Sequence, residues 1–70
     1  MKLMIDSDKL RREMAKRGIG IQDLAREAKV STTLVSKSAT ANKPVTLRSV
    51  GRLALALSID IDDLLLTNSH

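Results

Sequence analysis

Residues 21–38 constrain this chain most, because two helical apolar patterns follow one another there with only a short gap between them. Ser31 stands where an N-cap opens the second helix, so a tight turn centred on Lys29 joins the two. Two helices joined this closely form a helix-turn-helix. In that motif the second helix enters the major groove of DNA, and its outward side chains are candidates for contact. The apolar positions of the two predicted helices are Leu24, Ala25, Ala28, Leu34 and Val35.

The chain has 70 residues, a length that predicts one small domain over residues 1–70. Twelve Lys and Arg residues stand against eight Asp and Glu residues, so the formal net charge is +4. Every basic residue lies at or before Arg52, whereas Asp60, Asp62 and Asp63 lie near the end of the chain. This uneven distribution predicts an electropositive side and favours an anionic partner.

Several classes of protein are disfavoured by what the composition lacks. The sequence contains no Cys, which removes disulfides, thiolate metal sites and thiol catalysis, and fits a reducing cytoplasm. It contains no Phe, Tyr or Trp, so the bases of a single-stranded nucleic acid have no aromatic platform on which to stack. No apolar run approaches the roughly 20 residues that span a bilayer, and the N-terminus lacks the apolar core of a signal peptide. These features predict a cytoplasmic protein that does not enter a membrane.

Apolar spacing and capping residues predict an all-α fold with five helices and no strand. Asp6 or Ser7 opens the first helix, and Gly18 supplies the left-handed residue that ends it. Lys29 occupies a similar left-handed position, where a side chain adds roughly 1 kcal/mol of strain. The predicted helices span about residues 7–17, 20–28, 31–39, 47–57 and 60–65, and Thr40 to Thr46 form the main loop.

The helix over residues 47–57 is predicted to be the centre of the core, because it carries a full apolar stripe. The short last helix should bury Ile61 and Leu64, with Leu65 at its margin. The helix over residues 31–39 contains several β-branched side chains, so it must be held by packing. The stripe consists of Leu47, Val50, Leu53, Ala54 and Leu57.

With these residues in place, the chain resembles the Cro/CI (Xre) family of phage and plasmid repressors, from Leu10 to Leu65. The resemblance implies a compact five-helix, lambda-repressor-like DNA-binding domain. Each matching piece is short, and the spacing between the pieces makes the match specific. The pieces are Gly18-Ile19, Leu24-Ala25, Val30-Ser31, Val35-Ser36-Lys37, Pro44, Leu53-Ala54 and Leu57-Ser58-Ile59 through Asp62-Asp63-Leu64-Leu65.

Several positions depart from the family's pattern, including the helix exit at Ala39-Thr40-Ala41, where the family usually has Glu-Asn-Gly. Ile21 stands where the family often has a phosphate-clamping Gln, which is displaced here to Gln22. Leu34 stands where the family commonly has Thr, Ser or Gly, and Ser38 stands where it has a large apolar residue.

The resemblance places the family's base-reading positions on the outward part of the second motif helix, at Thr32, Thr33, Ser36 and Lys37. None of these is an Arg, Asn or Gln able to make a bidentate contact with a base, so we expect modest direct readout or readout of DNA shape. Helix N-termini near Gln22, Thr32 and Leu47 would offer N–H groups to phosphates. The basic side chains predicted to assist them are Lys37, Lys43 and Arg48.

Two functions follow from the same surface. The first is a Cro-like transcription regulator that binds operator DNA. The second is an antirepressor that uses this surface to bind a phage CI-type repressor, a role that the resemblance permits. Leu34 bears on the choice, because an outward Leu34 would suit a protein contact, whereas a partly buried Leu34 would pack on the helix over residues 47–57.

The sequence does not decide between a monomer and a homodimer. A weak homodimer would have to use exposed apolar residues such as Leu65, Leu66 or those near the N-terminus, and a monomer is the alternative.

Residues for catalysis or for a metal are scarce. The one His is His70, the last residue, and Asp60, Asp62 and Asp63 fit a helix cap better than a calcium loop. No Gly-rich phosphate cradle or nucleophile-base pair is present, so the sequence predicts neither an enzyme nor a cofactor site.

Overall fold

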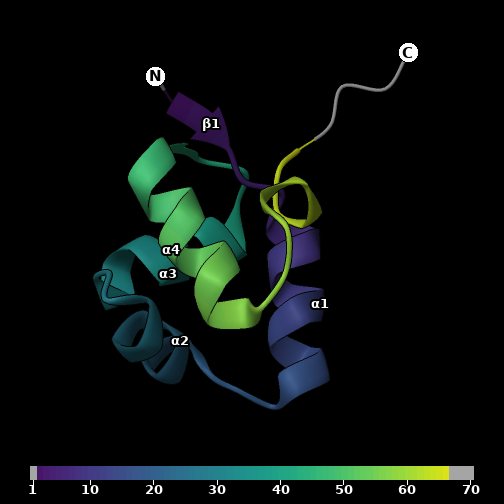
Figure 1. Cartoon of the computed structure of the whole chain (residues 1–70), viewed down its shortest axis with the longest axis vertical. Coiled ribbons are helices and arrows are strands. Elements are labelled where there is room, and N and C mark those ends of the chain that lie inside the picture. The colour runs from purple at the N-terminus through teal and green to yellow at the C-terminus, as the bar shows by residue number, and fades with distance from the viewer. Residues whose placement is uncertain (1, 67–70) are drawn as a thin grey trace.

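The computed structural model describes residues 2–66 of the chain, so His70 lies outside the described residues. Within that span, four α-helices enclose the core and a short antiparallel pair of strands lies beside them (Figure 1). No helix of these residues is long and apolar enough to cross a membrane. The elements are β1 (Lys2–Met4), α1 (Ser7–Arg17), α2 (Ile21–Ala28), α3 (Thr32–Thr40), β2 (Pro44–Thr46), α4 (Leu47–Leu57) and the single-turn 3-10 helix η1 (Ile61–Asp63).

Polar side chains cap the start of three α-helices, and two of these caps, Asp6 and Ser31, were predicted. Asp6 accepts hydrogen bonds from two backbone N–H groups in the first turn of α1. Ser31 Oγ accepts from the backbone N–H of Leu34 at 3.0 Å, and Thr46 Oγ1 accepts from that of Ser49 at 3.2 Å. Because the first N–H groups of a helix have no partner within it, these side chains fix where α1, α3 and α4 begin.

Left-handed residues end three of the helices. Gly18 ends α1 with φ 63°, and Lys29 ends α2 with φ 60°, both as predicted. Ser58 ends α4 in the same conformation with φ 58°, which the sequence did not indicate. The carbonyl oxygen of Lys29 accepts a hydrogen bond from Arg52 at 3.0 Å, so α4 supports the turn between α2 and α3.

The core is a cluster of aliphatic side chains with α4 at its centre, as the apolar stripe predicted. This helix packs against α2, both strands and η1, and its Val50, Leu53 and Leu57 have no exposed surface. The other fully buried aliphatic side chains come from every part of the fold. They are Ile5, Leu10, Leu24, Val35 and Leu64.

The prediction of five helices and no strand was wrong. Residues 2–4 pair with residues 44–46 in an antiparallel ribbon, inside the segments expected to be a lead-in and a loop. The extended N-terminal segment carries Ile5 into the core, and Pro44 is tolerated at the first position of a strand because no ladder donor is needed there. Pairing of segments so far apart in sequence depends on the tertiary fold, which local periodicity does not record.

Two predicted core residues are exposed. Leu47 is 53% exposed, because the first side chain of a helix points back past the helix end. Ile61 is 37% exposed, because η1 is one 3-10 turn where a longer helix over residues 60–65 was expected. Leu64, which follows η1, is the residue of this segment that is fully buried.

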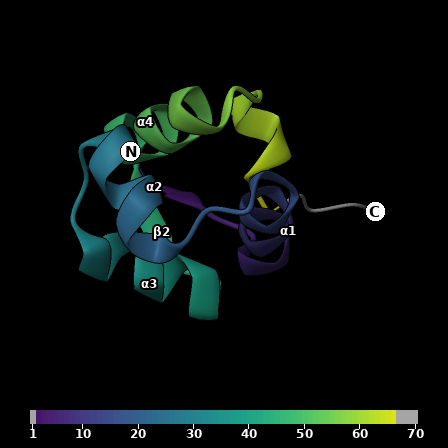
Figure 2. The ribbon, with the colours of Figure 1, turned by 90° about the horizontal axis from the view of Figure 1, so that it is seen from below.

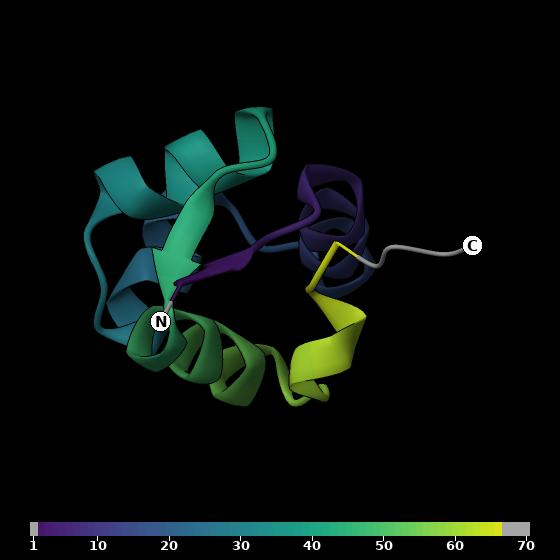
Figure 3. The same cartoon turned by 90° about the horizontal axis from the view of Figure 1, so that it is seen from above.

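The N-terminal part of the described chain holds the loop between α3 and α4. Ile5 donates its backbone N–H to the carbonyl of Lys43 at 3.2 Å, and Ser7 donates its own to Asn42 Oδ1 at 2.9 Å. The N-terminal segment also bonds to the end of the described chain, because the carbonyl oxygen of Met4 accepts a hydrogen bond from the backbone N–H of Leu66, with an N···O distance of 2.8 Å. Figures 2 and 3 show the paired strands β1 and β2 between α3 and α4.

The central position of α4 can be tested with two leucines of that helix. Leu53→Ala should lower the free energy of unfolding by about 2–5 kcal/mol, because it leaves a cavity in a small core. Leu55→Ala is the control, since Leu55 is 81% exposed and its loss should cost less than about 0.5 kcal/mol. Urea denaturation of both variants measures the difference. Equal costs would show that α4 is not central to the core.

Candidate nucleic-acid interface

Helix α3 presents one face to the core and the other to solvent. Its inward residues are Val35, Ser38 and Ala39, all buried. Thr32, Thr33 and Lys37 are exposed, and Ser36 is half-buried. The face predicted to be outward is therefore the solvent face, with Ser36 at its edge.

Grooves flank α3 on both sides. One lies between α3 and the start of α2, and the other lies between α3, β2 and the start of α4. Thr33 and Lys37 line both grooves, so they form the outermost ridge of the helix. Gln22, Thr32 and Ser36 line only the groove on the α2 side. Together these side chains make a convex helix edge with a depression along each flank.

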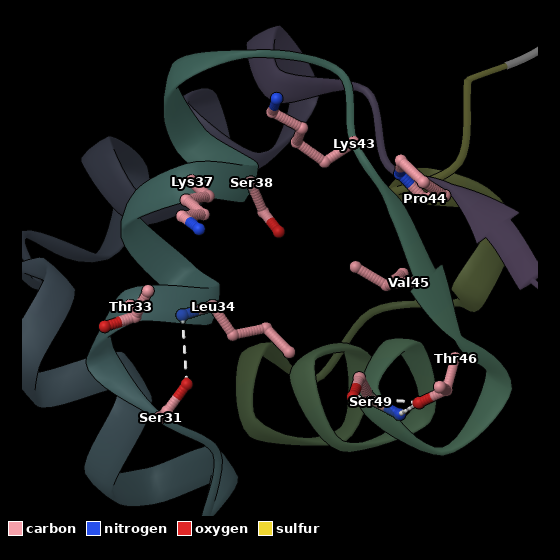
Figure 4. A pocket seen from close by; sticks show the side chains of 10 residues that line it. All are labelled: Ser31, Thr33, Leu34, Lys37, Ser38, Lys43, Pro44, Val45, Thr46 and Ser49. Carbon is pink, nitrogen blue, oxygen red and sulfur yellow. Dashed lines mark hydrogen bonds between the residues drawn. The ribbon is translucent and has the colours of Figure 1, made fainter.

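Leu34 lies on the side of α3 that faces β2 and α4. It is half-buried, packs against the core, and lines the same groove as Ser49 of α4. Figure 4 shows its side chain pointing away from Thr33 and toward that helix. The structure thus agrees with the packing interpretation of Leu34 and contradicts a fully outward side chain.

Positive charge without a carboxylate partner gathers on the α3 and α4 side. Lys37, Lys43 and Arg48 are exposed, and within residues 2–66 none of them forms an ion pair or a side-chain hydrogen bond. On α1, by contrast, Glu13 pairs with both Lys16 and Arg17. The hydrogen bond from Arg17 holds the pKa of the Glu13 carboxyl below its ordinary value.

The three helix N-termini differ in what they still offer an anion. At α2 the Asp23 carboxylate accepts from the backbone N–H of Gly20 at 3.3 Å, so a negative charge already sits there. At α3 and α4 neutral hydroxyls cap the helix, and no acidic residue lies in the first turn. The ends of α3 and α4 therefore favour phosphate more than the end of α2 does.

Ser38 is a feature of the site that sequence reasoning missed. Its side chain is 1% exposed, and its hydroxyl has no hydrogen-bond partner among the described residues. An unpaired buried hydroxyl costs about 1–3 kcal/mol. The sequence did carry a signal, because Ser38 replaces a large apolar residue of the pattern, and a smaller side chain there leaves space beside β2.

Acidic side chains form no metal centre in the described part of the chain, where no three Asp, Glu or His side chains gather closely enough to hold an ion. Asp63 Oδ2 accepts from the backbone N–H of Asp60 at 3.2 Å, which closes the start of η1.

A small helical domain with two tightly joined helices, an exposed second helix and unpaired lysines beside it defines a helix-turn-helix DNA-binding domain. The chain matches the family model of the Cro/C1-type HTH DNA-binding domain over residues 9–68, and it belongs to that family. Comparisons with curated proteins and with solved structures gave no match. The family makes the chain a DNA-binding transcription regulator by class.

The unpaired hydroxyl of Ser38 gives a test of the packing behind α3. Ser38→Ala should raise the free energy of unfolding by about 1 kcal/mol, because it removes a buried polar group that has no partner. Thr40→Ala is the control, since Thr40 Oγ1 is exposed and donates to the carbonyl of Ser36 at 2.7 Å. That variant should change stability by less than about 0.5 kcal/mol. A destabilised Ser38→Ala variant in urea denaturation would mean that the hydroxyl has a partner after all.

Proposed function

We propose that this chain is a Cro-like regulator that binds operator DNA by inserting α3 into the major groove. The observation that carries the proposal is the exposed ridge of Thr33 and Lys37, which stands between two grooves, and neither Lys37 nor the nearby Lys43 forms an ion pair within residues 2–66. A protruding helix suits the major groove, and the flanking depressions leave room for the two sugar-phosphate backbones.

Base contacts in this proposal come from Thr32, Thr33, Ser36 and Lys37. A hydroxyl makes single hydrogen bonds, a Thr methyl contacts a thymine methyl, and Lys37 donates to guanine or to a phosphate. With no bidentate donor among these side chains, discrimination between bases is modest. Sequence-dependent DNA shape supplies the rest of the specificity.

Phosphate contacts come from both flanks of α3. In this proposal Gln22 contacts phosphates of the DNA strand on the α2 side, and Lys43 and Arg48 contact phosphates of the strand on the α4 side. The backbone around Lys43 is fixed by two hydrogen bonds. Ser7 donates its N–H to the side chain of the preceding Asn42, and Ile5 donates its N–H to the carbonyl oxygen of Lys43. A loop fixed in this way delivers its lysine without a large ordering cost on binding.

The remaining proposals follow from this role. Residues 1–70 act as one domain whose helix-turn-helix spans about residues 21–38. The chain works in the cytoplasm, where its DNA target is, and it is a binding protein without an enzymatic activity or cofactor. Association of two copies on a paired operator would be weak.

A second candidate is a modulator that binds a phage CI-type repressor protein. Leu47 favours it, because this large apolar side chain is 53% exposed at the start of α4, directly after Thr46, which lines the groove next to α3. Leu34 is less suited to anchor a partner, since it is half-buried against the core of its own chain.

The DNA proposal predicts a salt-dependent affinity. Each bound chain should release on the order of 3–5 counterions, so binding weakens steeply as salt rises. Lys37→Ala should weaken binding by about 1–3 kcal/mol. Lys16→Ala is the control, because Lys16 lies on α1 and pairs with Glu13, and its loss should cost less than about 0.5 kcal/mol.

Fluorescence anisotropy with a labelled duplex at several salt concentrations measures both effects. An affinity that does not depend on salt would remove the nucleic-acid proposal, and equal losses in the two variants would remove α3 as the reading helix.

The modulator candidate predicts that Leu47→Ala loses the partner. The exposed leucine would be an anchor in the partner's pocket, so its truncation should cost about 2 kcal/mol or more in complex formation, with helicity unchanged. Leu55→Ala is the matched control, because it removes an equally large exposed side chain from the same helix.

The measurement is isothermal titration with a purified phage CI-type repressor. Identical binding by wild type and both variants would count against the modulator.

A further inference from the structure

The open groove between α3 and β2 has a volume large enough for a small molecule. Its volume is about 520 Å³, within the range of roughly 300–1,000 Å³ that is usual for ligand pockets. Leu34, Pro44 and Val45 give it an apolar wall. Figure 4 shows Leu34 and Val45 both pointing into the space, one from the helix and one from the strand.

One hydroxyl in this groove is uncommitted and buried. Ser31 Oγ and Thr46 Oγ1 are occupied as helix caps, the second of them also donating to Ser49 Oγ at 3.0 Å. Ser38 Oγ has no partner within the described residues, and in Figure 4 it points from the α3 wall into the groove. It is therefore a donor that lacks an acceptor.

The charge of the groove has one sign. Lys37 and Lys43 are among the residues that line it, and no Asp or Glu is. Figure 4 shows Ser38 on the same part of the wall as these two lysines, whereas Leu34 and Val45 lie farther toward α4. The groove thus has a cationic, hydrogen-bonding end and an apolar end.

We propose that this groove binds a small aliphatic carboxylate, and that the bound molecule weakens DNA binding. The carboxylate accepts from Ser38 and from the ammonium groups of Lys37 and Lys43, and the aliphatic body covers Leu34 and Val45. The regulatory half rests on the proposed function, because it requires that the two lysines also bind DNA.

The chemistry of the groove favours this class of ligand over a DNA phosphate. A backbone phosphate supplies charge at the rim but no apolar segment to cover the leucine and the valine. An inorganic anion has the same deficiency. An aliphatic carboxylate matches both ends, and its burial gives the Ser38 hydroxyl an acceptor.

The first experiment follows backbone amides by NMR while hexanoate is added to the full chain. Shifts of Leu34, Ser38, Val45 and Ser49 should saturate, while the amide of Gln22 in the other groove stays unchanged. Acetate has the charge without the body, and 1-hexanol has the body without the charge. Hexanoate should bind about tenfold more tightly than acetate and about threefold more tightly than hexanol.

A matched pair of variants tests the role of Ser38. Ser38→Ala should weaken hexanoate binding by about 3- to 10-fold, the loss of one hydrogen bond to a charged group. Thr40→Ala removes a hydroxyl from the same helix outside the groove and should bind hexanoate as wild type does. No saturable shift with hexanoate, or equal binding by Ser38→Ala and wild type, overturns the site.

The second experiment adds duplex DNA of mixed sequence at constant ionic strength. With hexanoate at ten times its dissociation constant, the apparent affinity for DNA should fall by about tenfold, and by less in Ser38→Ala. An unchanged DNA affinity with the groove occupied overturns the regulatory half alone. Absence of any DNA binding at low salt would refute the proposed function and the regulatory half, while the NMR titration still decides the site.

Discussion

The burial of Ile5 is the contact on which the arrangement of the site depends. Its side chain has no exposed surface, its N–H bonds to the carbonyl of Lys43, and it forms a bridge with Leu65. Three distant segments therefore meet at one residue. Without these contacts, the loop between α3 and α4 would be a flexible connection, and ordering it would cost more conformational entropy. Because that loop ends in β2 and Thr46 caps α4, the position of Ile5 also decides where α4 begins relative to α3.

Ion pairs involve basic residues of α1 and α2 but not those beside the exposed face of α3 in the described residues. Asp8, Glu13 and Asp23 pair with basic residues three or four positions along their own helices, so part of the positive charge of α1 and α2 is neutralised locally. Lys37 and Lys43 have no such partner within residues 2–66. Basic side chains without an ion-pair partner therefore stand beside α3, and this local arrangement matters more for steering an anion than the net charge of +4 does.

Helix α3 combines weak intrinsic helicity with an imperfectly filled inner face. Its β-branched residues lower its propensity, and it is held by the contacts of Val35 and by the bond from Arg11 to the carbonyl of Ala39. Ser38 adds a buried hydroxyl without a partner. Natural domains keep such local conflicts where function needs them, and here the conflict lies directly behind the face that the DNA proposal uses.

The sequence by itself determined the four α-helices, the caps Asp6, Ser31 and Gly18, the left-handed turn at Lys29, the central role of α4 and the family, because these depend on local spacing and on capping chemistry. It indicated which residues of α3 face outward, since Val35 fixes the inward face of the helix. Only the tertiary structure decided that residues 2–4 pair with β2, that Leu47 is exposed, and that Leu34 turns toward α4. These facts arise from segments that are distant in sequence and become neighbours only when Ile5 and Leu64 enter the same core, which no local pattern records.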